Sequence, residues 1–224
     1  MSALSRRKIR VGLVGFRNSG RVFHAPFLHT MSNMYELRSV VERHSNEAVK
    51  IYPCIKTVRS TTELFDDPDI DLVIIATSNN LHYSLSKEAL EKEKHVVIEK
   101  PMTIRSSEAL ELIELAKKKK LILCPYQILC PYQNRRYDSG YRTIKEIINR
   151  KLLGDEIHEC VIHFDRYRPE LNSGNAWRER NEPGAGAFYD LGSHLIDQAL
   201  SLFGHPQTIT ADIRIQRSVA HVDD

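Results

Sequence analysis

Residues 9–120 alternate short apolar runs with polar or amphipathic segments of helical length. A short apolar run between turn signals is typical of a strand buried on both faces. We expect strands at 9–14, 37–42, 56–58, 72–76 and 95–98, a helix opening near Gly20, and helices at 45–52, 82–92 and 106–120, the last capped by Ser106. Strands that alternate with helices form a parallel sheet covered on both faces, so the sequence predicts an α/β fold.

The pattern changes after Arg136. Helices are expected at about 141–154 and 188–203, and alternating, half-exposed strands at 156–166 and 208–216. We therefore expect a sheet domain at residues 1–136 and a second, incomplete α/β domain at 137–224.

Residues 122–127, Ile-Leu-Cys-Pro-Tyr-Gln, recur unchanged at 128–133. A single extra copy cannot stack into a repetitive core, so this is a local duplication rather than a solenoid. Proline cannot donate to a strand ladder, so Pro125 and Pro131 cannot both lie in a central strand. We expect the second copy to form the strand because it directly precedes Asn134. The first copy should then lengthen the loop after Lys120.

The first predicted strand runs into Gly15-Phe16-Arg17-Asn18-Ser19-Gly20. This is the outline of the dinucleotide fingerprint G-x-G-x-x-G of Rossmann-type folds, with Arg17 in place of the middle glycine. That glycine normally lets the backbone approach a pyrophosphate, so Arg17 either hinders binding or pairs with a phosphate oxygen itself. A tight turn is the alternative, but the flanking strand and helix favour a cofactor site formed by Gly15, Phe16, Arg17 and Gly20.

Other candidates for the cofactor site follow the next strands. Glu42 ends the second strand, where a carboxylate can bind ribose hydroxyls, and Arg43 follows it. Glutamate favours NAD and arginine favours NADP, so the choice stays open. Thr77-Ser78-Asn79 lies at the carboxyl edge of the sheet and forms either a cofactor contact or a helix-capping turn. His82 is a candidate for helix packing or for contact with the cofactor.

Two segments carry groups suited to moving a hydride and a proton. Lys100 lies between Glu99 and Pro101, at a strand end where the proline fixes the turn. Asp190 and His194 are spaced i to i+4 on the predicted helix at 188–203 and share a face, and Asp197 follows one turn later. Taken one at a time, Lys100 could be a surface lysine, Asp190 an acid that interacts with the helix dipole, and His194 a histidine packed in an interface. With a cofactor fold they favour a dehydrogenase, because histidine accepts a proton near neutral pH.

Composition excludes several other classes. The formal net charge of +3 is too small to indicate nucleic-acid binding, and the Lys117–Lys120 run fits a helix C-terminus. No secretory signal and no run of membrane-spanning length is visible. The four cysteines lack paired spacing, which suits reduced thiols and indicates neither a disulfide frame nor a zinc site. We expect a cytoplasmic protein whose partner is a small molecule, with no metal.

These motifs resemble the Gfo/Idh/MocA oxidoreductase family over nearly the whole chain. Glu99-Lys100-Pro101 is similar to its E-K-P motif, and Asp190, His194 and Asp197 match its D-x-x-x-H-x-x-D helix. Segments 22–26, 134–138, 166–169 and 189–194 resemble its NADP-dependent scyllo-inositol dehydrogenase subgroup, and Trp177-Arg178 resembles a further family segment.

The resemblance implies a dehydrogenase that uses NAD or NADP and acts on the hydroxyl or ketone of a polyol, inositol or sugar. Lys100 would orient substrate and cofactor, His194 would exchange the proton, and Asp190 would position the hydroxyl. Lys100, Asp190, His194 and Asp197 would contact substrate. Glu99, Lys100, Trp177 and Arg178 would lie near the cofactor.

The chain departs from the family at Arg17, at the 122–133 duplication, and at Asp224, where family members continue through more strands of an open sheet. Because that sheet makes the oligomer contact in the family, we expect a truncated chain that self-associates as a homo-oligomer. The alternative function is a non-catalytic dinucleotide-binding regulatory protein or a truncated pseudoenzyme.

Overall fold

The computed structural model describes residues 7–125, 134–171 and 177–224. The chain divides into two compact units after Pro125, so the predicted boundary after residue 136 lies further along the chain. No helix within the described ranges has the length and apolar character needed to cross a membrane.

The first unit is built on a parallel sheet of six strands, which confirms the predicted fold class. The strands are β1 Ile9–Val14, β2 Tyr35–Val41, β3 Lys56–Val58, β4 Leu72–Ile75, β5 His95–Ile98 and β6 Leu123–Pro125. Their order is β3-β2-β1-β4-β5-β6. The chain thus winds outward from β1 on one side and from β4 on the other, so β1 and β4 meet where the winding reverses.

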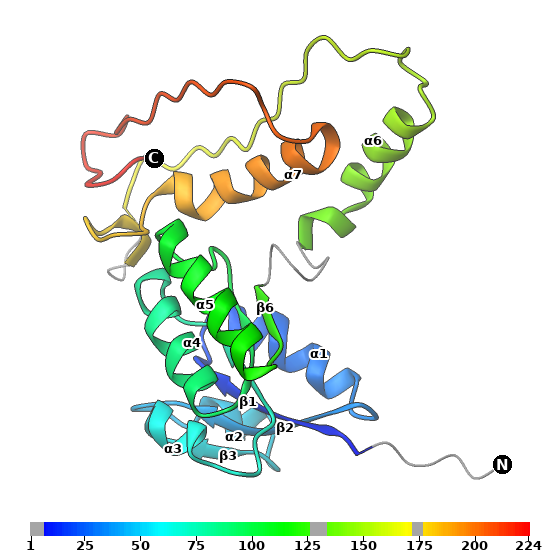
Figure 1. Ribbon diagram of the computed structural model, residues 1–224. Helices are drawn as coiled ribbons and strands as arrows, with labels where there is room; N and C mark the ends of the chain where they lie inside the picture. Colours follow the sequence, from blue (N-terminus) through cyan, green and yellow to red (C-terminus); the bar gives the residue numbers. More distant parts are fainter. Residues whose placement is uncertain (1–6, 126–133, 172–176) are drawn as a thin grey trace, which may run out of the picture. The chain divides into compact units, whose positions relative to one another are not determined.

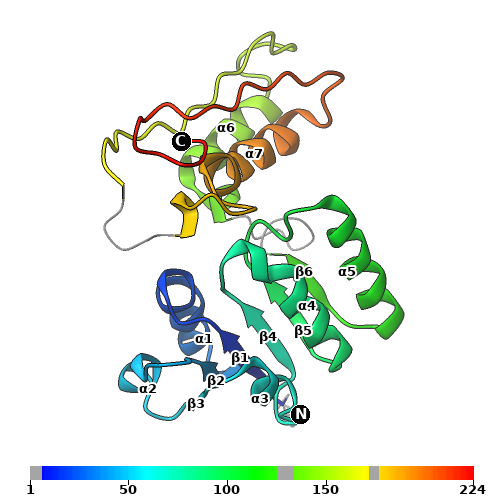
Figure 2. The same cartoon turned by 90° about the vertical axis from the view of Figure 1, so that its left-hand side faces the viewer.

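Helices cover both faces of this sheet (Figures 1 and 2). The π-helical turn η1 Gly20–His24 leads into α1 Ala25–Thr30, which lies with α2 Glu47–Ile51 on one face. The opposite face carries α3 Thr61–Phe65, α4 His82–Glu91 and α5 Ser106–Lys119, and the short 3-10 turn η2 Asn79–Leu81 precedes α4.

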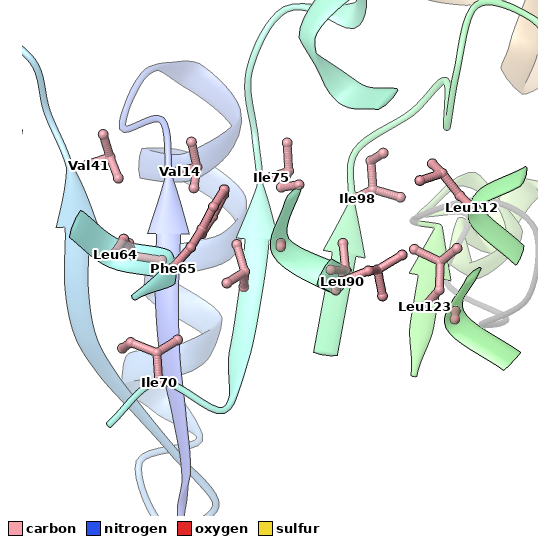
Figure 3. Packing of buried hydrophobic residues seen from close by; sticks show 14 of the residues in the cluster. Val14, Val41, Leu64, Phe65, Ile70, Ile75, Leu90, Ile98, Leu112 and Leu123 are labelled. Atoms are coloured by element: carbon pink, nitrogen blue, oxygen red, sulfur yellow. The ribbon is translucent and has the colours of Figure 1, made fainter. Parts of the chain in front are cut away.

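Each face of the sheet has its own apolar cluster, because successive strand side chains point to opposite sides. Val14 and Ile75 pack with Phe65, Leu90 and helix α5 on one face (Figure 3). Val11, Leu13 and Val40 pack against α1 and α2 on the other. Full burial of each large apolar side chain stabilises the fold by about 1.5–3 kcal/mol relative to exposure, so the two clusters hold the helices against both faces of the sheet.

Two local predictions for this unit are wrong. Strand β6 lies in the first copy of the duplication, where Val97 of β5 pairs with Cys124, whereas the second copy lies outside the described residues. Helix α5 ends at Lys119, so the first copy is the next chain available to β5. Ser106 is the first helical residue rather than the cap; Arg105 occupies that position, and its N–H donates to the Glu108 carboxylate at 3.3 Å.

The second unit contains the 3-10 turns η3 Asn134–Tyr137 and η4 Trp177–Glu179, the helix α6 Ser139–Asn149, the π-helical turn η5 Phe188–Gly192 and the helix α7 Ser193–Phe203. Tyr141 ties α6 to α7 by donating its hydroxyl hydrogen to Ser201 Oγ at 2.8 Å. The helix expected at 188–203 is therefore present, with a π-helical first turn.

Three predictions for the second unit are wrong. Helix α6 ends at Asn149 rather than near Gly154, because Lys151 adopts a left-handed conformation with φ of 56°. The segments 156–166 and 208–216 have no regular secondary structure and are not strands. A strand requires a hydrogen-bonded neighbour, and neither segment pairs in a ladder with any described part of the chain.

Candidate dinucleotide-binding site

The glycine turn after β1 lies at the reversal point of the sheet. Gly15 has a φ of +97°, and a Cβ there would lie 2.5 Å from the carbonyl oxygen of Ala76, just beyond β4. A Cβ at Gly20 would lie 2.0 Å from the Gly15 carbonyl oxygen. Both glycines are needed for the chain to turn tightly and for η1 to pack on the turn, as in dinucleotide-binding folds. Ligands of such sheets bind at the carboxyl ends of the strands beside this point.

The two residues after Gly15 differ in exposure. The Phe16 side chain is buried against Tyr52, with ring centroids 6.4 Å apart, so it packs in the core and only its backbone faces the turn. Arg17 is exposed. The Arg17 side chain is therefore available to a ligand phosphate, whereas any contact of Phe16 with a cofactor would be made by its backbone and stays a prediction.

Glu42 lies at the end of β2 but turns inward. Its Oε1 accepts hydrogen bonds from Ser45 Oγ at 2.6 Å and Glu47 N at 3.0 Å, and Oε2 accepts one from Ala48 N at 2.9 Å. The side chain therefore caps the start of α2, and the residue is only 6% exposed. Arg43, next to it, is exposed.

The His82 ring fixes the loop after β4 through hydrogen bonds to backbone carbonyls. This histidine has no exposed surface; its Nδ1 lies 2.7 Å from the Pro101 carbonyl oxygen and its Nε2 lies 3.3 Å from that of Thr77. Burial lowers the pKa of His82 and outweighs the two carbonyls and Glu99, which favour the charged ring. His82 thus joins the ends of β4 and β5, which is the packing role, one of the two alternatives that the sequence left open. Thr77 and Ser78 are partly exposed above it, and Asn79 is buried.

The Glu99 carboxylate anchors the turn after β5. Oε1 accepts hydrogen bonds from Ser19 Oγ and contacts His24 Nε2 at 2.9 Å, and Oε2 accepts one from Lys100 N at 3.1 Å. Burial alone would raise the pKa of Glu99. The contacts with His24, Ser19 and the Lys100 amide lower it by more than burial raises it, so the pKa lies below its ordinary value. The carboxylate therefore ties the glycine turn to Lys100, which is partly exposed at the strand end.

Sequence reasoning assigned no role to Ser19 or His24 in this anchor. Their side chains lie about one helical turn apart, and only the fold brings them to Glu99. The one available signal was the match of His24 to the family-like segment 22–26.

Of the predicted substrate residues, Lys100 lies in the first unit, and Asp190, His194 and Asp197 lie in the second. Asp190 lies in η5, where Arg178 Nε is 3.1 Å from its Oδ1, and the Arg178 guanidinium lies 4.9 Å from the centre of the Trp177 ring. These three predicted residues form one cluster. Asp223 adds a contact the sequence did not indicate, since its Oδ2 accepts a hydrogen bond from Phe188 N at 2.6 Å.

His194 and Asp197 occupy the first turns of α7. His194 is buried to 8% exposure. Asp197 accepts two hydrogen bonds from Arg136, at 2.8 Å and 2.7 Å, and this pairing raises the Arg136 pKa. The bidentate pair attaches η3 to α7, so the Asp197 carboxylate is engaged within the unit. Arg136 is a further residue whose part in the site the sequence did not reveal.

The first unit is thus defined by its sheet order and glycine turn as a dinucleotide-binding domain. Residues 9–127 match the oxidoreductase family with an NAD-binding Rossmann fold, and residues 141–224 match the GFO/IDH/MocA C-terminal domain. The chain belongs to the Gfo/Idh/MocA oxidoreductase family, as the motifs indicated.

The relatives of this chain align with almost its whole length. It is 39% identical over 216 residues to the uncharacterized oxidoreductase YdgJ of Escherichia coli, covering 96% of this chain and 60% of that protein. It is 38% identical to scyllo-inositol 2-dehydrogenase (NADP(+)) IolW of Bacillus subtilis, covering 96% and 58%. The crystal structure of the Bacillus subtilis oxidoreductase yvaA superposes with a TM-score of 0.84 at 36% identity, covering 98% and 61%. The chain thus spans about three fifths of these relatives.

Proposed function

We propose that this protein is an NAD(P)-dependent dehydrogenase that acts on the CH–OH group of a polyol, inositol or sugar, or on the corresponding ketone. The observation that carries the proposal is the Glu99 anchor. It attaches Lys100 to the same η1 segment that closes the glycine turn. A cation is thereby held beside the expected cofactor site, where a hydroxyl or carbonyl oxygen would be polarised.

The residues at the carboxyl edge fit a nicotinamide dinucleotide. The Gly15–Gly20 turn keeps side-chain bulk away from the strand ends, and exposed Arg17 offers a guanidinium to phosphate. Bound there, the nicotinamide supplies hydride transfer to or from carbon.

The proton is the part of the reaction assigned to the chain itself. In the oxidation direction the His194 imidazole would accept the proton from the substrate hydroxyl as a bound nicotinamide would supply the acceptor for the hydride on the same carbon. Lys100 stabilises the developing negative charge on that oxygen, and Asp190 orients the hydroxyl. In reduction the same proton returns from His194 to the oxygen.

The substrate class rests on chemistry and on relatives. A lysine, a carboxylate and a histidine suit a compound with adjacent hydroxyl groups, and the relative IolW is named for oxidising scyllo-inositol. We extend that class, a cyclic polyol or sugar, to this chain.

The test follows formation of reduced nicotinamide with scyllo-inositol, myo-inositol and glucose. We expect turnover with at least one cyclic polyol, and a fall in kcat of about a hundredfold or more for His194→Ala with little change in cofactor affinity. His205→Ala is the matched control, because that histidine is exposed on the same unit. Equal kcat for His194→Ala and the wild type would remove the proton-transfer role, and no turnover with tight cofactor binding would favour the regulatory alternative.

A further inference from the structure

In dinucleotide-binding folds, residues at the end of β2 contact the adenosine ribose, where NADP carries a 2′-phosphate and NAD a hydroxyl. In this chain the first such residue is the buried Glu42. In a dinucleotide-binding fold, an acid at this position selects NAD by accepting hydrogen bonds from the ribose hydroxyls. Here both Glu42 oxygens already accept hydrogen bonds from Ser45, Glu47 and Ala48, and the residue is 6% exposed. Turning it toward a ribose would leave the first amides of α2 without their acceptor.

The exposed part of the same loop is cationic. Arg43 has no hydrogen bond or ion pair with any described residue, and its side chain is exposed. Arg59 donates from its guanidinium to the Glu42 carbonyl oxygen at 2.7 Å, the Ser45 carbonyl oxygen at 2.6 Å and Asn46 Oδ1 at 2.7 Å. All three acceptors are neutral, and no carboxylate of the described chain lies within ion-pairing distance of that guanidinium.

We infer that this chain prefers NADP to NAD, because Arg43 binds the 2′-phosphate while Arg59 braces the loop and adds positive charge, and Glu42 serves only as a helix cap. The inference rests on the proposed function, since it assigns a ligand to one end of the same dinucleotide site. A guanidinium pairs with a phosphate through two parallel hydrogen bonds, and a phosphate monoester carries close to two negative charges near neutral pH. NAD has only a neutral hydroxyl at that position, and the Glu42 carboxylate is already engaged by Ser45, Glu47 and Ala48.

Binding measurements on the whole 224-residue chain test this without requiring turnover. Isothermal titration with NADPH and NADH should show NADPH binding about tenfold or more tightly. Adenosine 2′,5′-bisphosphate should compete with NADPH, and AMP should compete much less. Arg43→Ala should weaken NADPH about tenfold and leave NADH within about twofold. Lys50→Ala is the matched control: it removes an exposed charge from the adjacent α2, where Lys50 pairs with Glu47 at 2.6 Å, and should change neither affinity.

A second variant separates the cap from a ribose ligand. Glu42→Gln should lower the melting temperature, because the amide nitrogen that replaces one carboxylate oxygen cannot accept a hydrogen bond from α2. NADPH should remain the tighter ligand. A loss of NADH affinity without loss of thermal stability would show that Glu42 binds the ribose hydroxyls and would overturn the inference. Tighter binding of NADH by the wild type, or equal loss of both cofactors in Arg43→Ala, would overturn it and leave the proposed function standing. Binding of neither cofactor would remove both.

Discussion

Glu42 and His82 are polar residues at strand ends whose chemistry suggested ligand binding and whose burial gives them another role. Glu42 caps α2, and His82 bridges the Thr77 and Pro101 carbonyls. Both hold loops at the carboxyl edge of the sheet. Sequence reasoning could not distinguish these roles, because the same residue types serve ligands and loop backbones equally well.

His82 makes the stability of the first unit depend on pH. Its folded-state pKa is lowered by burial, so below about pH 6.5 the unfolded chain binds a proton that the folded chain does not. Stability should therefore fall as pH drops below 6.5 and stop falling below the folded pKa. The slope from this group is at most about 1.4 kcal/mol per pH unit.

Replacing His82 by asparagine should remove that contribution, because the amide can still donate to the Pro101 carbonyl but does not titrate. Urea unfolding of both proteins between pH 8 and pH 5 measures it. His163→Asn is the control, since that histidine is exposed in the second unit. Parallel pH profiles for the wild type and His82→Asn would show that His82 does not titrate differently on unfolding.

Among the elements, strand β6 forms from the first copy of the duplicated sequence, which follows directly after α5. Leu123 is 8% exposed and belongs to the apolar cluster under α4 and α5 (Figure 3). Deleting either copy of the duplication produces the same sequence, so a deletion cannot show which copy forms the strand. Single substitutions within each copy can.

We expect Leu123→Ala to lower the free energy of unfolding by about 2–3 kcal/mol, through lost burial and the cavity left behind. Leu129→Ala, the same change in the second copy, is the control and should cost less than about 1 kcal/mol. Chemical denaturation of the two variants gives the comparison. A larger loss for Leu129→Ala would assign the strand to the second copy.

The sequence predicted the first unit well because buried parallel strands and the glycine turn are encoded locally. It missed α3, although Ser60-Thr61-Thr62-Glu63 is a capping signature in which Ser60 accepts a hydrogen bond from Glu63 N at 3.1 Å. In the second unit, alternation at 156–166 and 208–216 predicted strands. Alternation of apolar and polar residues indicates which side chains of a strand would share a face. Whether the strand forms depends on a pairing partner that is distant in sequence. The Glu99 anchor was missed for the same reason.

At the scale of the whole molecule, the second unit exposes apolar side chains along 208–216. Ile209, Ile213 and Ile215 are 82%, 54% and 52% exposed. Exposed apolar groups gathered on one segment favour association with another surface. This supports the expected homo-oligomer, which remains a prediction.

The chain should therefore self-associate in a concentration-dependent manner, as measured by size-exclusion chromatography with light scattering. Replacing Ile209, Ile213 and Ile215 by serine should shift it toward monomer. The same substitution at Ile144, which is exposed on α6, serves as the control for loss of one apolar group. A wild-type chain that stays monomeric at high concentration would contradict the prediction.

Hydrogen–deuterium exchange with and without NADPH measures whether a nicotinamide dinucleotide binds at the carboxyl edge of the sheet. We expect slower exchange in the glycine turn 15–20, in the β2–α2 loop 42–46, and around Thr77 and Lys100. Helix α6, at residues 139–149 of the second unit, should be unchanged in the same experiment. If saturating NADPH protects none of these strand-end segments, or protects only residues elsewhere, the dinucleotide does not bind at this edge of the sheet.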